Sequence, residues 1–349
     1  MWNKGALIKK PSAPTPTLPN IVFPLHNVAT GVCDVQGGYL NEVRANSSYT
    51  KVTKTYSNLW QKYGILKPTS WDAIDQKAIS SFGSYVSRKK HTNPEVHISM
   101  EPGITDTAAM STLYRQLVAV GDLLGTGFDY PTFGKPVSIV AFKDGDWLKD
   151  EYVSLGCDPD IAVQKTTHTV NTTAGWANTP TLEVILNLGS PGFWTGGKFG
   201  ANLGILGGHE FFHLIQFQNT FLLSNASEVA QPGWIVEGGA SLVGALVSDY
   251  LKIAPFEVRY TTKTISSYAE GRTLNLESSD GTMFIYPLGL LGSEFLVSIV
   301  GFEKFVNIWK EAGKGKVFPD AFQDATGIEL SDFYKMFYEI RPILGLKQK

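Results

Sequence analysis

The chain has 349 residues, of which 43% are apolar and 12% aromatic, enough to bury a sizeable core; a disordered or fibrous protein is therefore excluded. Its 30 basic and 32 acidic residues leave a formal charge of −2, so no basic field exists to attract nucleic acid or anionic lipid. The longest apolar segment, 283–300, contains Pro287 and Glu294 and is unlike a lipid-facing helix. We expect a globular protein with no transmembrane span and no nucleic-acid partner.

The first 104 residues are expected to form two parts. Residues 1–24 are rich in proline and predict an extended tether. Residues 25–104 form an N-terminal region of unknown role that is partly helical, with helical spacing at 48–63 and 71–90. No signal peptide is visible at the start, whereas the low content of charged residues, 18%, favours a secreted or extracytoplasmic protein.

The two cysteines leave two alternatives open. Cys33 and Cys157 could form one disulfide in an oxidising compartment or remain two buried thiols. Their separation in sequence does not decide between these alternatives, because pairing depends on geometry.

Residues 105–202 alternate between the periodicity of helices and that of strands. The pattern predicts a helix at 108–125, a strand at 135–142, a short helix at 146–154 and a strand at 182–188. These residues therefore form an α+β upper lobe with a small mixed sheet. The second strand, LEVILNL, is a candidate edge strand along which an extended peptide could pair.

Residues 203–349 are expected to be mainly helical, so the fold class is α+β with a helical lower lobe. Pro319 suits a first helical turn, and Gly313 and Gly327 mark breaks between helices. The predicted helices are 203–223, 234–252, 256–270, 285–299, 302–312, 318–325 and 330–340.

A His-Glu-x-x-His sequence lies within the first of these helices, in GILGGHEFFHLIQFQN. His209 and His213 are four residues apart, so both imidazoles lie on one helix face and can bind the same ion. Glu210 is rotated about 100° from His209, which keeps it out of the set of ligands but close to a bound water. This arrangement is typical of a zinc site with Glu210 as the general base.

A catalytic zinc ion usually has three protein ligands, so a third donor is needed. Glu237 lies 24 residues after His213, on the predicted next helix, where Gly238 and Gly239 would allow the two helices to approach closely. The other four histidines stand alone in loop-like or strand-like sequence. Glu237 is therefore the better candidate, although a carboxylate near a helix start can also serve as a cap.

The combination of His-Glu-x-x-His with Trp-Ile-Val-Glu-Gly-Gly-Ala resembles the gluzincin metallopeptidases, the broad group with aminopeptidase N-like and thermolysin-like enzymes. The resemblance covers about residues 105–340 and implies a zincin-like catalytic domain. It also implies one Zn²⁺ per chain, bound by His209, His213 and Glu237, and a peptide or protein substrate. Tyr286, in Tyr-Pro-Leu-Gly, matches the tyrosine that stabilises the oxyanion in this group; an ordinary tyrosine at a helix start is the alternative.

The resemblance has two departures. No Gly-x-Met-Glu-Asn segment is present between residues 130 and 205, so aminopeptidase action is not supported. The spacing from His213 to Glu237 is also longer than in aminopeptidase N-like enzymes. Two alternatives to a peptidase stay open: a catalytically silent binding or surface protein with the same fold, and a zinc hydrolase that acts on another bond.

Overall fold

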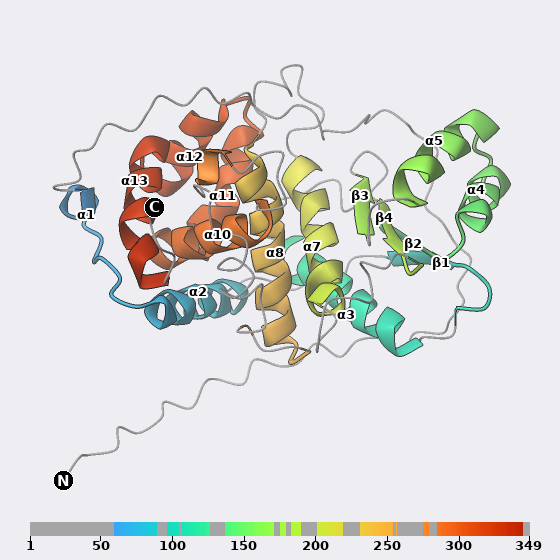
Figure 1. Cartoon of the computed structure of the whole chain (residues 1–349), viewed down its shortest axis with the longest axis horizontal. Coiled ribbons are helices and arrows are strands. Elements are labelled where there is room, and N and C mark those ends of the chain that lie inside the picture. The colour runs from blue at the N-terminus through green and yellow to red at the C-terminus, as the bar shows by residue number, and fades with distance from the viewer. Residues whose placement is uncertain are drawn as a thin grey trace, which may run out of the picture.

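A computed structural model describes residues 59–88, 96–104, 107–125, 137–170, 175–178, 183–189, 201–218, 231–253, 256, 275–278 and 285–344. The predicted tether at 1–24, Cys33 and most of the predicted helix at 256–270 lie outside these residues. The described part is a helix-rich protein with one small sheet, in agreement with the expected α+β class (Figure 1). None of its helices is long and apolar enough to cross a membrane.

The sheet has the strand order β1-β2-β4-β3. Its strands are β1 (Val96–Met100), β2 (Val137–Phe142), β3 (Gly175–Asn178) and β4 (Glu183–Asn187). The first two pairs in this order are parallel, and β3 pairs with β4 in the antiparallel sense. The strands predicted at 135–142 and 182–188 are confirmed.

The expectation that 182–188 forms an edge strand is wrong. Strand β4 lies between β2 and β3, and all five of its residues are buried. The apolar run reflects burial on both faces, which is a property of an interior strand. Among the described strands, the antiparallel edge is β3.

Helices cover both faces of the sheet (Figure 1). They are α4 (Gly145–Ser154) and α5 (Pro159–Val170) on one face, and α7 (Ala201–Gln218) with α3 (Thr107–Gly125) on the other. Strand β2 serves both layers, because Val140 and Phe142 pack with α4, whereas Ile139 and Ala141 belong to the larger core. Cys157, on the α4 side, is buried and disulfide-bonded.

The described residues of 203–349 are helical, as the sequence predicts. Besides α7, their elements are α8 (Gly233–Tyr250), η5 (Leu276–Ser278), α10 (Pro287–Val300), α11 (Phe302–Ala312), α12 (Phe318–Thr326), α13 (Leu330–Ile340) and η7 (Arg341–Leu344). The N-terminal region contributes α1 (Leu59–Lys62) and α2 (Trp71–Val86). Helix α10 contains the long apolar segment and is buried over most of its length. Helix α2 packs against α10 and α11, so this part of the N-terminal region belongs to the helical core.

Glycines bring α7, α8 and α10 into direct backbone contact. A Cβ atom on Gly208 of α7 would lie 2.9 Å from Gly244 Cα of α8. A Cβ atom on Gly238 of α8 would lie 2.0 Å from the carbonyl carbon of Gly289 of α10. The close approach of α7 and α8 therefore occurs at Gly208 and Gly244, whereas Gly238, which we expected there, contacts α10 instead.

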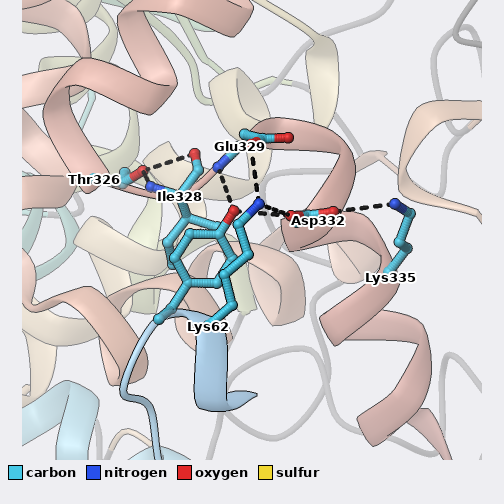
Figure 2. A network of polar contacts seen from close by, with 7 residues as sticks. Lys62, Thr326, Ile328, Glu329, Asp332 and Lys335 are labelled. Atoms are coloured by element: carbon cyan, nitrogen blue, oxygen red, sulfur yellow. Dashed lines mark hydrogen bonds and ion pairs between the residues drawn. The ribbon is translucent and has the colours of Figure 1, made fainter. Parts of the chain in front are cut away.

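Polar contacts attach α1 to the start of α13 (Figure 2). The Lys62 ammonium lies 2.9 Å from Glu329 Oε1 and 2.8 Å from Asp332 Oδ2. The Tyr63 hydroxyl donates to the same Asp332 oxygen, and Lys335 lies 3.0 Å from the other. These contacts join segments that are about 270 residues apart in the chain.

Candidate metal centre

Helix α7 is buried throughout its central part, because it packs against α3, α8 and strands β3 and β4. His209 and His213 lie on the same face of this helix, as their spacing predicts. Both residues are 7% exposed, and their Nε2 atoms are 3.0 Å apart. The two imidazoles therefore direct one nitrogen each toward a common point.

Glu237 reaches this point from α8. Its Oε2 atom lies 3.3 Å from His209 Nε2 and 3.4 Å from His213 Nε2. The structure thus brings together the three residues that the sequence suggests as metal ligands. Within the described residues they form the one group of three or more histidine, cysteine or acidic side chains that could hold a metal ion.

The spacing of the three atoms fits a small tetrahedral ion. Donors that each lie about 2.0 to 2.1 Å from such an ion are roughly 3.3 to 3.4 Å from one another. The separations given above, 3.0, 3.3 and 3.4 Å, are close to this value. Two imidazoles and one carboxylate also form a ligand set that zinc accepts in catalytic sites.

The other ring nitrogen of each histidine has a partner of its own. His213 Nδ1 lies 2.7 Å from Gln216 Oε1, and His209 Nδ1 lies 3.2 Å from Ser241 Oγ. Such partners fix the orientation of each ring, so that Nε2 is the nitrogen directed toward the other candidate ligands. Sequence reasoning missed both residues; the position of Gln216, three after His213 on the same helix face, was a usable signal.

Glu210 is also buried, at 6% exposed, and its carboxyl group lies close to strand β3. A Cβ atom on Gly175 of this strand would lie 3.0 Å from Glu210 Oε1. Burial raises the pKa of Glu210, and the Glu237 carboxylate adds to this effect, whereas the two imidazoles oppose it. A carboxyl group with a raised pKa suits repeated uptake and release of a proton.

Tyr286 lies beside the histidine pair. Its ring stacks with that of His209, with centroids 6.1 Å apart and an interplanar angle of 28°. The residue immediately precedes α10, and Gly289, three positions later, is the contact point with α8. The helix crossing that places α10 against α8 therefore also places this phenol near the centre.

The His213 imidazole and the Glu237 carboxylate shift each other's pKa. Burial alone would lower the pKa of His213, but the Glu237 carboxylate, Glu210 and the bond with Gln216 raise it to about 9. Burial opposes ionisation of Glu237, yet the two histidines hold its pKa well below the usual range. Within the described residues, no lysine or arginine forms an ion pair with Glu210 or Glu237.

No family model, curated protein or solved structure matches this chain. The described residues define a helix-rich α+β protein with a candidate metal centre of two buried histidines and one glutamate.

Proposed function

We propose that this chain is a zinc-dependent peptidase of the gluzincin type with a zincin-like fold. The observation that carries the proposal is the convergence of His209, His213 and Glu237, with the buried Glu210 next to them. Two neutral imidazoles and a carboxylate favour zinc over the hard cations, which prefer oxygen ligands. Bound zinc would act as a Lewis acid and would lower the pKa of a water molecule in its open position.

The protein side chains would carry the proton and stabilise the charge. Glu210 accepts a proton from the attacking water and later gives it to the departing amine. Its burial keeps the pKa above that of an ordinary carboxyl group, which makes the second transfer easier. The phenol of Tyr286 donates a hydrogen bond to the negative oxygen that develops on the substrate carbonyl.

The position of β3 supports a peptide as substrate. This strand is an edge of the described sheet and passes Glu210 at Gly175. An extended peptide that pairs with an exposed strand edge gains main-chain hydrogen bonds without a demand on its sequence. We therefore place the pairing that we expected along 182–188 on β3 instead.

A catalytically silent protein with this fold is less well supported. It would retain three convergent ligands, a buried acid and the bonds to both Nδ1 atoms without a chemical requirement for them. A hydrolase for another bond would use the same residues, so the substrate class is decided by assay.

The first test is metal analysis of three purified proteins after dialysis against a mild chelator: wild type, His213→Ala and Glu237→Ala. We expect about one zinc ion per wild-type chain and a loss of metal in both variants, because two ligands hold a tetrahedral ion poorly. Folded wild-type protein that binds no added zinc would refute the proposal. If zinc is bound, a peptide library is then screened with Glu210→Gln as the blank.

A further inference from the structure

Gln216 connects the two helices that carry the candidate ligands. Its side chain is fully buried on α7. At one end, Oε1 lies 2.7 Å from His213 Nδ1. At the other end, Nε2 donates a hydrogen bond of 3.0 Å to the carbonyl oxygen of Val236 on α8. Val236 immediately precedes Glu237, so one side chain reaches from one ligand to the neighbour of another.

These two contacts fix the direction of the amide and, with it, the state of the imidazole. A backbone carbonyl only accepts hydrogen bonds, so the NH₂ end of Gln216 must face Val236. The oxygen of Gln216 then faces His213 Nδ1, and this nitrogen must carry the proton. The neutral His213 ring is therefore held with its lone pair on Nε2, the nitrogen that faces Glu237.

Ser241, the partner of His209, does not select a tautomer of that ring. Ser241 Oγ, next to His209 Nδ1, belongs to a hydroxyl group that can either donate or accept. Its contact crosses from α8 to α7 and orients the ring, but either tautomer of His209 satisfies it. Gln216 is thus the group that selects a tautomer at this centre.

We propose that Gln216 is a positioning residue of the metal centre: it holds the metal-binding tautomer of His213 and fixes the distance from this ring to Glu237. The inference rests on the proposed metal binding, but both of its parts can be measured without an assay of catalysis. The tautomer is a property of the His213 imidazole. The distance from this ring to Glu237 is a property of the contact between α7 and α8.

The chain offers a matched control in Gln116. This second glutamine, on α3, is also fully buried and also joins helices: its Oε1 accepts from Gly207 N, and its Nε2 donates to Ser248 Oγ. Neither contact touches a candidate ligand. Replacement of each glutamine by methionine removes similar buried hydrogen bonds and keeps a similar volume.

The first measurement is the dissociation constant for Zn²⁺, obtained by competition with a chromophoric chelator. We expect Gln216→Met to weaken zinc binding about 10- to 100-fold, which is typical for loss of a partner that orients a metal-bound histidine. Gln116→Met should bind zinc like the wild type while it loses thermal stability. Equal weakening in both variants would show a general effect of packing and would overturn the proposal.

The second measurement reads the tautomer directly in metal-free protein. In ¹⁵N-histidine spectra of the neutral imidazoles, the wild type should show a protonated Nδ1 and a bare Nε2 at His213, because Nδ1 faces the Gln216 oxygen. Gln216→Met should show a mixture. An unchanged tautomer in this variant contradicts the proposal, even if the wild type binds no zinc and the peptidase assignment fails.

Gln216→Glu separates the two contacts. The carboxylate still accepts the proton of His213 Nδ1 but cannot donate to Val236 O. We expect the wild-type tautomer with a zinc affinity between those of the wild type and Gln216→Met. A mixture of tautomers in Gln216→Glu would overturn the role of the acceptor, and this variant remains informative if Gln216→Met does not fold.

Discussion

Two buried polar clusters lie on opposite sides of the sheet, and they are completed in different ways. Behind the sheet, Lys165 Nζ of α5 lies 2.9 Å from Glu183 Oε2 of β4. The Tyr152 hydroxyl donates to the other oxygen of this carboxylate, and the Lys165 ammonium lies 4.5 Å from the centre of the Tyr152 ring. The charges of this cluster cancel, and each oxygen of the buried carboxylate has a donor.

The candidate metal centre sets its acidic side chains against imidazoles rather than against a lysine or arginine. Glu210 and Glu237 face two imidazoles, and the described lysines and arginines contribute no ion pair. The comparison teaches that a buried cluster with matched permanent charges needs only the fold, whereas the donor atoms of His209, His213 and Glu237 converge at a spacing that could hold a metal ion.

The largest expected effect is on catalysis, with Glu210→Gln. Turnover of a cleaved peptide should fall about 10²- to 10⁴-fold, because the side chain can no longer accept a proton. Zinc content should stay at the wild-type level. The free energy of unfolding of the metal-free protein should not fall, since no described group donates a hydrogen bond to the Glu210 carboxylate.

Peptide cleavage, zinc analysis and urea unfolding of the same preparation check all three statements. Turnover that is unchanged in Glu210→Gln would remove the general base from the mechanism. A marked loss of stability with normal turnover would mean that Glu210 is a structural carboxylate like Glu183, and the contrast between the two clusters would disappear.

The next largest effect is on stability, with Lys165→Met. This change leaves the Glu183 carboxylate buried without its cation, which typically costs about 3 to 5 kcal/mol. The double variant Lys165→Met/Glu183→Gln should recover part of this loss, because the amide is neutral and its oxygen still accepts from Tyr152. Zinc binding should be unaffected in both variants, as the cluster lies on the far face of the sheet from α7.

Urea unfolding curves of Lys165→Met, Glu183→Gln and the double variant give the coupling energy between Lys165 and Glu183. Additive losses would show that Lys165 and Glu183 do not stabilise the protein as a pair. Loss of zinc in Lys165→Met at a concentration where the protein remains folded would show that the two clusters are not independent.

The parts of the site that could be predicted from the sequence depend on local spacing. His209, Glu210 and His213 share a helix whose geometry fixes their relative directions, and the helices α7, α8 and α10 follow from apolar periodicity. Their meeting with Glu237 was inferred from its place on the next predicted helix and from the resemblance to gluzincins, and it is now seen in the distances.

The remaining features depend on contacts that are distant in sequence. Strand β3 has only four residues, Gly-Trp-Ala-Asn, too few for a periodic signal, so its place at the sheet edge was not predicted. The pairing of Lys165 with Glu183 also lacks a local pattern, because it requires α5 to fold back on β4. For the same reason the sequence predicted close contact of Gly238 with α7, whereas its neighbour is Gly289 of α10.

The smallest expected effect is that of Asp332→Asn, in the contacts between α1 and α13 (Figure 2). Burial would raise the pKa of Asp332, but the bonds from Lys62, Lys335 and Tyr63 outweigh this effect and lower it. A lowered carboxyl pKa stabilises the fold above the ordinary value of about 4, and this contribution is lost as the pH falls through the lower value in the folded protein. The variant should therefore melt roughly 1 to 3 °C below the wild type near neutral pH, and the difference should shrink in acid.

Thermal melts of the wild type and Asp332→Asn between neutral pH and the acid limit of folding test this expectation. The control is Asp324→Asn, because Asp324 also pairs with a lysine, Lys316, but its side chain is 53% exposed. Its melting temperature should barely change, since exposed ion pairs contribute little. A constant difference for Asp332→Asn at every pH would mean that its charge is not what stabilises the fold. In the expected case, an ion pair contributes most where both partners are buried, at Lys165, less at the buried Asp332 with its partly exposed lysines, and least at the exposed Asp324. The burial of both partners then sets the size of the effect.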